Sequence, residues 1–151
     1  MRTNIRDGIF LVALGAYGTV ALGARTPQQQ QQHPPEAGAH HHPQAAKLKN
    51  VVPSTAASIA AGLALYQKQC AGCHGDTGKG DGAMGEELNP TPSNLTDADW
   101  THGSTDGEIF TVIRDGVKST GMKPYGRKMT THQVWDVVNY IRSIGPKTGS
   151  S

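Results

Sequence analysis

Two cysteines and a histidine lie within one five-residue stretch of this chain, Cys70-Ala71-Gly72-Cys73-His74. The chain has no other cysteine, so a scaffold built on several disulfides is excluded. Of its 151 residues only 36% are hydrophobic and 5% aromatic, and 19 are glycine. Its net charge of +2 gives no case for nucleic-acid binding, which usually needs a strongly basic surface. The length predicts about one domain, and the composition leaves open what fills the core of that domain.

The pattern C-x-x-C-H is the attachment signal for c-type haem. Two thiols separated by two residues can each bond one vinyl group of the same porphyrin, and the next residue, His74, is then placed where its imidazole binds iron. Cys70, Cys73 and His74 are therefore predicted to hold one haem c. Three other interpretations are weaker. A thioredoxin-like dithiol needs a βαβ unit, a zinc site would need His102 or His132 as a fourth ligand, and a disulfide across so tight a loop adds little stability.

Composition divides the chain into four segments. Residues 1–24 combine a positive start, an apolar run and an A-x-G cleavage site, which predicts an export signal, with an uncleaved membrane anchor as the alternative. Residues 25–54 are rich in Pro, Gln and His and are predicted to form a disordered linker. Residues 55–147 carry the periodic apolar patterns and are predicted to form the single folded domain, followed by a tail over 148–151.

Helical periodicity predicts three helices and an all-α fold. Their expected bounds are Ser58–Gln69, Thr105–Gly116 and Thr130–Gly145. The second and third begin with capping boxes, because Glu108 and Gln133 stand three residues after their threonines. No stretch alternates in the manner of a strand. Residues 75–104 are expected to be mostly loop, with a short helical turn around Ala83–Leu88. Such a long loop is acceptable only if something other than chain packs against it.

A six-coordinate haem iron needs a second axial ligand, and Met122 is predicted to supply it. Met122 lies 48 residues after His74, in a stretch bent by glycine and stiffened by proline, which can present a thioether at a fixed point. Met84 is expected on the wrong side because it is only ten residues from His74, and Met129 is expected to pack against the last helix. Two histidines remain as lesser alternatives, His102 and His132.

At these residues the chain resembles the class I monohaem cytochromes c of bacteria. The resemblance starts with a G-x-x-x-Y-x-x-x-C-x-x-C-H pattern and covers about 90 residues, essentially the whole folded domain. The matching positions are Gly62, Tyr66, Cys70, Cys73 and His74, then residues 89–96, 106–110, 121–122 and 135–143. One departure is Lys123, which separates Met122 from Pro124 where the family often has Met-Pro.

The resemblance implies a small helical domain wrapped around one covalently attached haem. It implies that the first and last helices cross near a right angle, with Gly62 allowing close approach and Tyr140 lying over the contact. It also implies that a proline carbonyl, from Pro90 or Pro92, accepts the proton of the second nitrogen of His74. Trp100 is expected either to face a haem propionate or to pack in the core.

With His74 and Met122 both bound, iron has no open position, so the predicted function is electron transfer and not enzymatic catalysis. The haem would shuttle electrons between periplasmic or membrane-bound redox proteins, such as an oxidase, a reductase or a dehydrogenase. The alternatives are a fixed haem subunit of a larger respiratory or dehydrogenase complex and, less favoured, a haem enzyme or sensor. The predicted location is the periplasm, with membrane anchoring through the N-terminal apolar segment as a variant.

The near-neutral total charge hides an asymmetry. Between Asp76 and Glu108 there are eight acidic residues and one lysine, a net charge of −7, whereas between Arg114 and Lys128 five basic residues face one acid, a net charge of +4. The basic stretch flanks Met122. Its side chains are predicted to steer an acidic redox partner, with a plain solvated surface as the alternative. The side chains concerned are Lys118, Lys123, Arg127 and Lys128.

Overall fold

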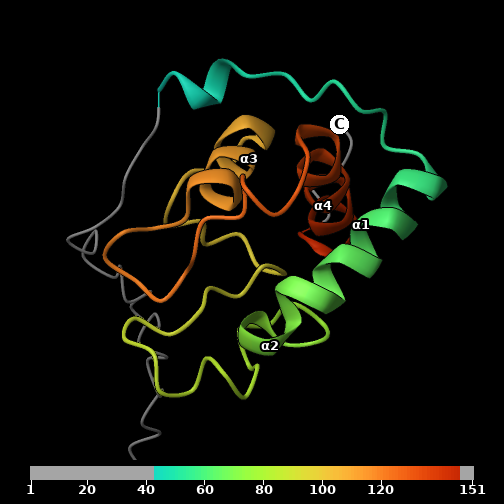
Figure 1. Ribbon diagram of the computed structural model, residues 1–151. Helices are drawn as coiled ribbons and strands as arrows, with labels where there is room; N and C mark the ends of the chain where they lie inside the picture. Colours follow the sequence, from blue (N-terminus) through green and yellow to red (C-terminus); the bar gives the residue numbers. More distant parts are fainter. Residues whose placement is uncertain (1–42, 147–151) are drawn as a thin grey trace, which may run out of the picture. The chain divides into compact units, whose positions relative to one another are not determined.

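The computed structural model describes residues 43–146, which fold into helices joined by long loops (Figure 1). The helices are the 3-10 helix η1 (Ala45–Lys47), α1 (Ala56–Gln69), α2 (Ala71–His74), α3 (Asp106–Asp115) and α4 (Thr131–Ile144). Within these residues there is no strand, which confirms the all-α fold class. None of the helices in this part of the chain is long and apolar enough to cross a bilayer. The predicted export signal, most of the linker and the tail lie outside the described residues.

The helix boundaries follow from capping chemistry at the sequence positions that predicted them. The Thr105 hydroxyl accepts the Glu108 backbone N–H, and the Thr130 hydroxyl accepts that of Gln133, each within a complete capping box. Helix α1 begins two residues earlier than predicted, because Thr55 caps the Ser58 N–H. Residues 83–87 form hydrogen-bonded turns and not a helix. The chain therefore turns where a short helical turn was expected, but the turn is not helical.

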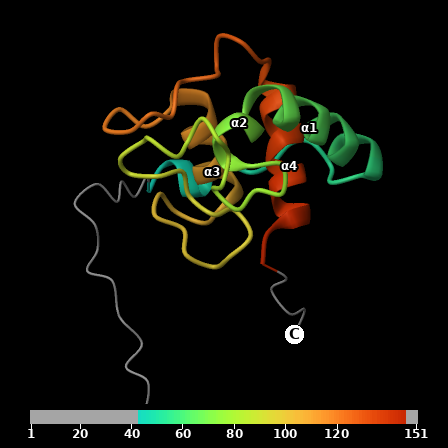
Figure 2. The ribbon, with the colours of Figure 1, turned by 90° about the horizontal axis from the view of Figure 1, so that it is seen from below.

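Helix α1 crosses α4, as Figure 2 shows from below, and the two helices are closest at Gly62. A Cβ atom placed on Gly62 would lie 2.0 Å from the backbone oxygen of Asp136 and 2.9 Å from the Cβ of Tyr140. The helix backbones therefore touch, and only glycine fits there. Next to the crossing, the rings of Tyr66 and Tyr140 pack with centroids 5.0 Å apart. The structure confirms the close approach at Gly62 and the place of Tyr140 over it.

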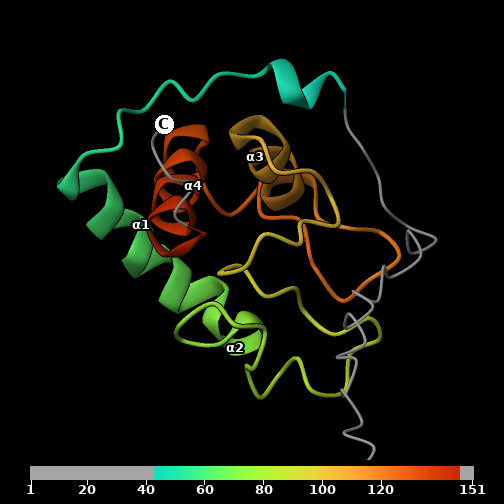
Figure 3. The ribbon, with the colours of Figure 1, turned by 180° about the vertical axis from the view of Figure 1, so that it is seen from behind.

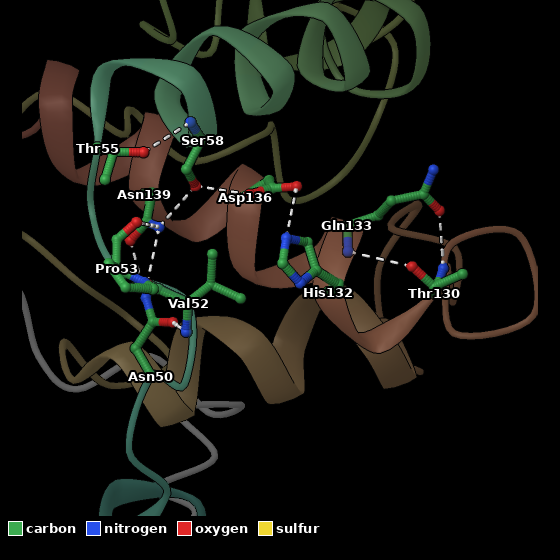
Figure 4. Close-up of polar contacts among 10 residues, drawn as sticks. All are labelled: Asn50, Val52, Pro53, Thr55, Ser58, Thr130, His132, Gln133, Asp136 and Asn139. Atoms are coloured by element: carbon green, nitrogen blue, oxygen red, sulfur yellow. Dashed lines mark hydrogen bonds and ion pairs between the residues drawn. The ribbon is translucent and has the colours of Figure 1, made fainter.

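Buried polar side chains tie α1 to α4 beside this crossing (Figure 4). The Ser58 hydroxyl donates to the Asp136 carboxylate at 2.6 Å, and the Asn139 amide donates to the Ser58 oxygen at 2.9 Å. Buried polar groups need such partners, because an unpaired one costs about 1–3 kcal/mol. The exposed His132 imidazole lies 3.8 Å from the same Asp136 carboxylate.

Residues 43–54, which we call the strap, belong to the predicted linker of residues 25–54, and in the structure they pack on the domain. The strap runs over α3 and α4 on the side away from α2 (Figures 1 and 3). Ala45 and Val52 are buried, and Asn50 donates to the Asn139 side chain at 2.8 Å. Asn139 in turn donates to the Val52 carbonyl at 3.2 Å. The burial of Ala45 and Val52 and the hydrogen bond from Asn50 thus hold a segment whose composition alone predicts disorder.

The main core lies between α3 and α4, where Phe110 stacks on Trp135 with ring centroids 4.2 Å apart. Val134, Val137 and Val138 are almost fully buried beside them. Five apolar side chains pack against this core yet stay partly exposed: Leu65, Leu95, Trp100, Met122 and Tyr125. These five side chains therefore pack at the boundary of the core and keep part of their surface exposed.

The helix crossing makes a stability prediction. Gly62→Ala puts a methyl group into the backbone of α4, and overpacking of this kind costs about 1–3 kcal/mol. We expect the holoprotein to lose free energy of unfolding in chemical denaturation although alanine favours helix. The control is Ala61→Gly on the exposed face of α1, which loses only helix propensity, about 1 kcal/mol. A Gly62→Ala protein as stable as wild type would contradict the contact.

Candidate haem-binding site

One turn of chain places both thiols and the imidazole. Cys70 ends α1, with its N–H bonded to the Tyr66 carbonyl at 2.8 Å. The chain then turns into α2, where the N–H groups of Cys73 and His74 both donate to the Cys70 carbonyl, at 3.1 and 2.9 Å. Both cysteines are half-buried and neither is in a disulfide, so the disulfide alternative is wrong. The structure thus brings together the three residues that the sequence predicted.

The environment of the thiols does not suit a redox dithiol or zinc. Burial, followed by the neighbouring Cys73, raises the pKa of the Cys70 thiol to about 11, whereas reactive dithiols have a lowered pKa. Residues 43–146 also lack the strands of a βαβ unit. Over the same residues, no group of three or more His, Cys, Asp and Glu side chains is arranged to hold a metal ion. The zinc alternative therefore gains no support.

The His74 ring is oriented by a backbone carbonyl. Its Nδ1 lies 3.1 Å from the oxygen of Ser93, and this contact is a hydrogen bond only if Nδ1 carries the proton, because a carbonyl oxygen only accepts. Burial lowers the pKa of His74, and the bond to Ser93 opposes that shift in part. A neutral imidazole with Nδ1 protonated leaves the lone pair of Nε2 free to bind a metal, and a second partner of this kind is common for metal-bound histidines.

The acceptor differs from the expectation of a proline. The Pro92 carbonyl instead lies against Gly80, where an added Cβ would be 2.3 Å from the Pro92 oxygen. Pro92 therefore faces the loop that follows His74, and the next residue, Ser93, faces the imidazole. The expectation was right about the loop and wrong about the residue, because sequence alone does not tell which of several carbonyls in an extended segment points at the ring.

The loop after His74 folds back on the haem-attachment turn through backbone hydrogen bonds. Gly80 N–H donates to the His74 carbonyl at 2.8 Å and Gly82 N–H to the Cys73 carbonyl at 3.1 Å. The Tyr66 hydroxyl donates to the Gly75 carbonyl at 2.8 Å, and burial together with nearby acidic groups raises the Tyr66 pKa far above its usual value. Tyr66 belongs to the predicted G-x-x-x-Y-x-x-x-C-x-x-C-H pattern, but its bond to Gly75 was not predicted.

Met122 comes from a separate loop, between α3 and α4. Its N–H donates to the Thr120 hydroxyl at 3.1 Å and its carbonyl accepts the Val117 N–H at 3.1 Å. The side chain is half-buried and packs against the main core. Tyr125, in the same loop, donates its hydroxyl to the Gln69 carbonyl at 2.8 Å, which joins this loop to the residue before Cys70.

The other candidate ligands are placed elsewhere. Met129 is buried in the core, as expected. Met84 is 72% exposed and lies beside Gly72, where an added Cβ would be 2.7 Å from the Met84 sulfur. The His132 imidazole is 70% exposed and faces Asp136. His102 is half-buried, and Met122 packs against the main core while keeping part of its surface exposed.

The residues present fit a haem c. Two half-buried thiols and a neutral imidazole stand on one turn, and five apolar side chains that pack against the main core keep exposed surface that a porphyrin could cover. Trp100 is one of these, and the Arg142 guanidinium lies 5.7 Å from its ring centroid while its Nε bonds Asp106 at 2.7 Å. Trp100 thus packs on the core, and its approach to a propionate stays a prediction.

The fold and this arrangement of residues define the chain as a class I c-type cytochrome. The profile of the family described as cytochrome c oxidase, cbb3-type, subunit III, matches residues 57–141. The chain belongs to this family.

Curated relatives carry the same description. The chain is 30% identical over 106 residues to the cbb3-type cytochrome c oxidase subunit CcoP of Azospirillum sp. strain B510, which covers 62% of this chain and 33% of that protein. It is 26% identical over 98 residues to the subunit FixP of Azorhizobium caulinodans, covering 65% of this chain and 31% of that one. The chain thus spans about a third of the length of these relatives.

Solved cytochrome structures share the fold. Cytochrome cL of Hyphomicrobium denitrificans is 26% identical, with a TM-score of 0.54 over 67% of this chain and 55% of that chain. Cytochrome cL of Methylophaga aminisulfidivorans is also 26% identical, with a TM-score of 0.51 over 61% of this chain and 60% of that one. These structures confirm the cytochrome c fold that the sequence predicted.

Proposed function

We propose that this chain transfers electrons through one haem c, attached to Cys70 and Cys73 and ligated by His74 and Met122. The observation that carries the proposal is the turn at Cys70–His74, with the His74 Nδ1 held on Ser93. The sequence contains one C-x-x-C-H motif, which supports a single covalent haem. Bound haem supplies a reversible one-electron couple, whose potential His/Met ligation raises relative to other axial pairs.

The protein residues in this proposal fix ligands and exclude a substrate. With His74 and Met122 as its two protein ligands, a bound haem iron would have no open position for a small-molecule substrate, which supports a non-enzymatic role. The backbone bonds from Gly80 and Gly82 hold the His74 side of the site. A site whose protein ligands are held in this way suits an electron carrier, because its ligation would hardly change between oxidation states.

The comparisons favour the fixed subunit over the free shuttle that the sequence put first. The relatives are named as subunits of cbb3-type cytochrome c oxidases, and the family profile carries the same description. We therefore assign this domain to a larger respiratory assembly, with redox proteins as its partners, on the periplasmic side. Anchoring through residues 1–24 is part of the same proposal.

The basic residues around the Met122 loop remain a candidate approach surface. Lys118, Lys123, Arg127 and Lys128 are all exposed, and the Lys128 ammonium lies 5.4 Å from the Tyr125 ring centroid. That these side chains steer an acidic partner stays a prediction. If they do, the rate of electron transfer to the partner should fall as salt is added.

The ligation is tested by absorption spectra of the holoprotein in both oxidation states. Wild type should show a low-spin haem whose ferrous form is unchanged by carbon monoxide. Met122→Ala should open one axial position, become high-spin or take up another ligand, and bind carbon monoxide rapidly. The matched control is Met84→Ala, which removes an exposed methionine and should leave the spectra unchanged. Identical spectra for Met122→Ala and wild type would show that another residue is the ligand.

The assembly is tested on the full chain expressed from its own host with the N-terminus intact. Membranes solubilised in mild detergent are separated on a native gel and stained for covalent haem and for oxygen reduction. The proposal expects this chain's haem in a large complex that also reduces oxygen. A chain found only in the soluble fraction as a monomer would contradict the fixed subunit and favour the shuttle.

A further inference from the structure

A tyrosine joins the two halves of the proposed haem site. The Tyr125 hydroxyl donates to the backbone carbonyl of Gln69 at 2.8 Å, across 56 positions of sequence. Gln69 is the last residue of α1 and directly precedes Cys70. Tyr125 lies three residues after Met122 in the loop between α3 and α4. The bond therefore connects the loop of the proposed methionine ligand to the start of the haem-attachment turn.

The Gln69 carbonyl is available because the helix breaks beside it. In an uninterrupted α-helix this carbonyl would accept the N–H of Cys73, four residues on. Here the Cys73 N–H donates to the Cys70 carbonyl instead, at 3.1 Å, because α1 ends and α2 begins on a new axis. A helix end leaves carbonyls that need another donor. The Tyr125 hydroxyl supplies that donor from the opposite loop.

The loop end of the contact is fixed as well. The Tyr125 N–H donates to the Ile113 carbonyl at 3.1 Å, and its own carbonyl accepts the N–H groups of Lys128 and Met129 at 2.8 and 3.0 Å. Its ring packs half-buried against the core. Because the backbone and the ring of Tyr125 are both held, the position of its hydroxyl relative to the loop is fixed as well.

The backbone of Met122 is held against the end of α3 as well. Gly116 ends α3 with a φ of +67°. The returning segment of the loop can lie against it, since an added Cβ would be 2.8 Å from the Met122 oxygen. The Met122 carbonyl accepts the Val117 N–H at 3.1 Å. Met122 and Tyr125 are thus held in one loop, and the Tyr125 hydroxyl bonds that loop to Gln69, the residue before Cys70.

The electrostatics of the phenol agree with this geometry. Burial, then the nearby thiols of Cys70 and Cys73, raises the pKa of Tyr125. The hydroxyl therefore stays protonated, and able to donate, at every pH where the protein is expected to work.

We propose that Tyr125 is a positioning residue that holds the Met122 loop against the Cys70–His74 turn and so keeps Met122 on the iron. This role rests on the proposed ligation by Met122. Without the hydroxyl the loop keeps its bonds to α3 but loses this direct bond to the turn. An added ligand then competes more easily with Met122 for the axial position.

The test uses the full-length holoprotein and its Tyr125→Phe variant. In the ferric state the methionine-to-iron charge-transfer band is followed while imidazole is titrated in, which gives the affinity of imidazole for the position held by methionine. Loss of one such hydrogen bond should raise this affinity about 2- to 10-fold, with the ring packing retained. The loop should also release methionine faster when imidazole is present in excess.

Tyr66→Phe is the matched control. It also removes one tyrosine hydroxyl that donates to a backbone carbonyl at 2.8 Å, that of Gly75, but it lies on the histidine side and does not touch the Met122 loop. It should lower the unfolding midpoint and leave the imidazole affinity unchanged. Equal increases in imidazole affinity for both variants would show general loosening and overturn the positioning role.

The outcomes also separate this role from the proposed function. If wild type lacks the methionine-to-iron band, the proposed ligation fails, and the positioning role fails with it. If wild type shows the band and Tyr125→Phe binds imidazole as weakly as wild type does, the ligation stands and only the positioning role is overturned.

Discussion

The rest of the structure depends on one turn of chain between α1 and α2. Cys70 ends one helix, and its carbonyl accepts the N–H groups of Cys73 and His74, so two thiols and an imidazole stand on one turn. The loop that follows returns to this turn through Gly80 and Gly82. This loop is thus arranged around the attachment turn, whereas the strap and the Met122 loop pack on the apolar core.

This arrangement explains how a chain with so few aromatic residues forms a domain. The main core lies between α3 and α4, and half-buried residues such as Leu95, Trp100 and Met122 pack against it. A porphyrin packed on those side chains would bury them and supply a large apolar surface, at roughly 25 cal/mol per Å² removed from water. Covalent attachment suits this design, because so small a domain cannot enclose its cofactor on all sides.

The sequence predicted those features that depend on local chemistry. Thr105 and Thr130 mark helix starts because a hydroxyl and a glutamate or glutamine satisfy N–H groups within four residues. Gly62 was found through a family resemblance, and the structure gives its reason, the Asp136 backbone 2.0 Å from an added Cβ.

The features that were missed depend on contacts between distant parts of the chain. The strap is held by Asn139, nearly ninety positions away, and no local signal marks it. The same holds for Ser93 beside His74 and for the Tyr125 hydroxyl on Gln69. Which carbonyl faces a donor is settled by the packing of whole loops, so composition and periodicity carry no trace of it.

The claim on which the account rests is that one haem is bonded to Cys70 and Cys73. Intact-mass spectrometry of the exported protein, after denaturation and acid–acetone extraction, measures this directly. The account predicts a chain that keeps the mass of a single haem through extraction, and a Cys70→Ala, Cys73→Ala chain that keeps none. A wild-type chain that loses its haem to the solvent, or that carries no haem at all, would contradict it.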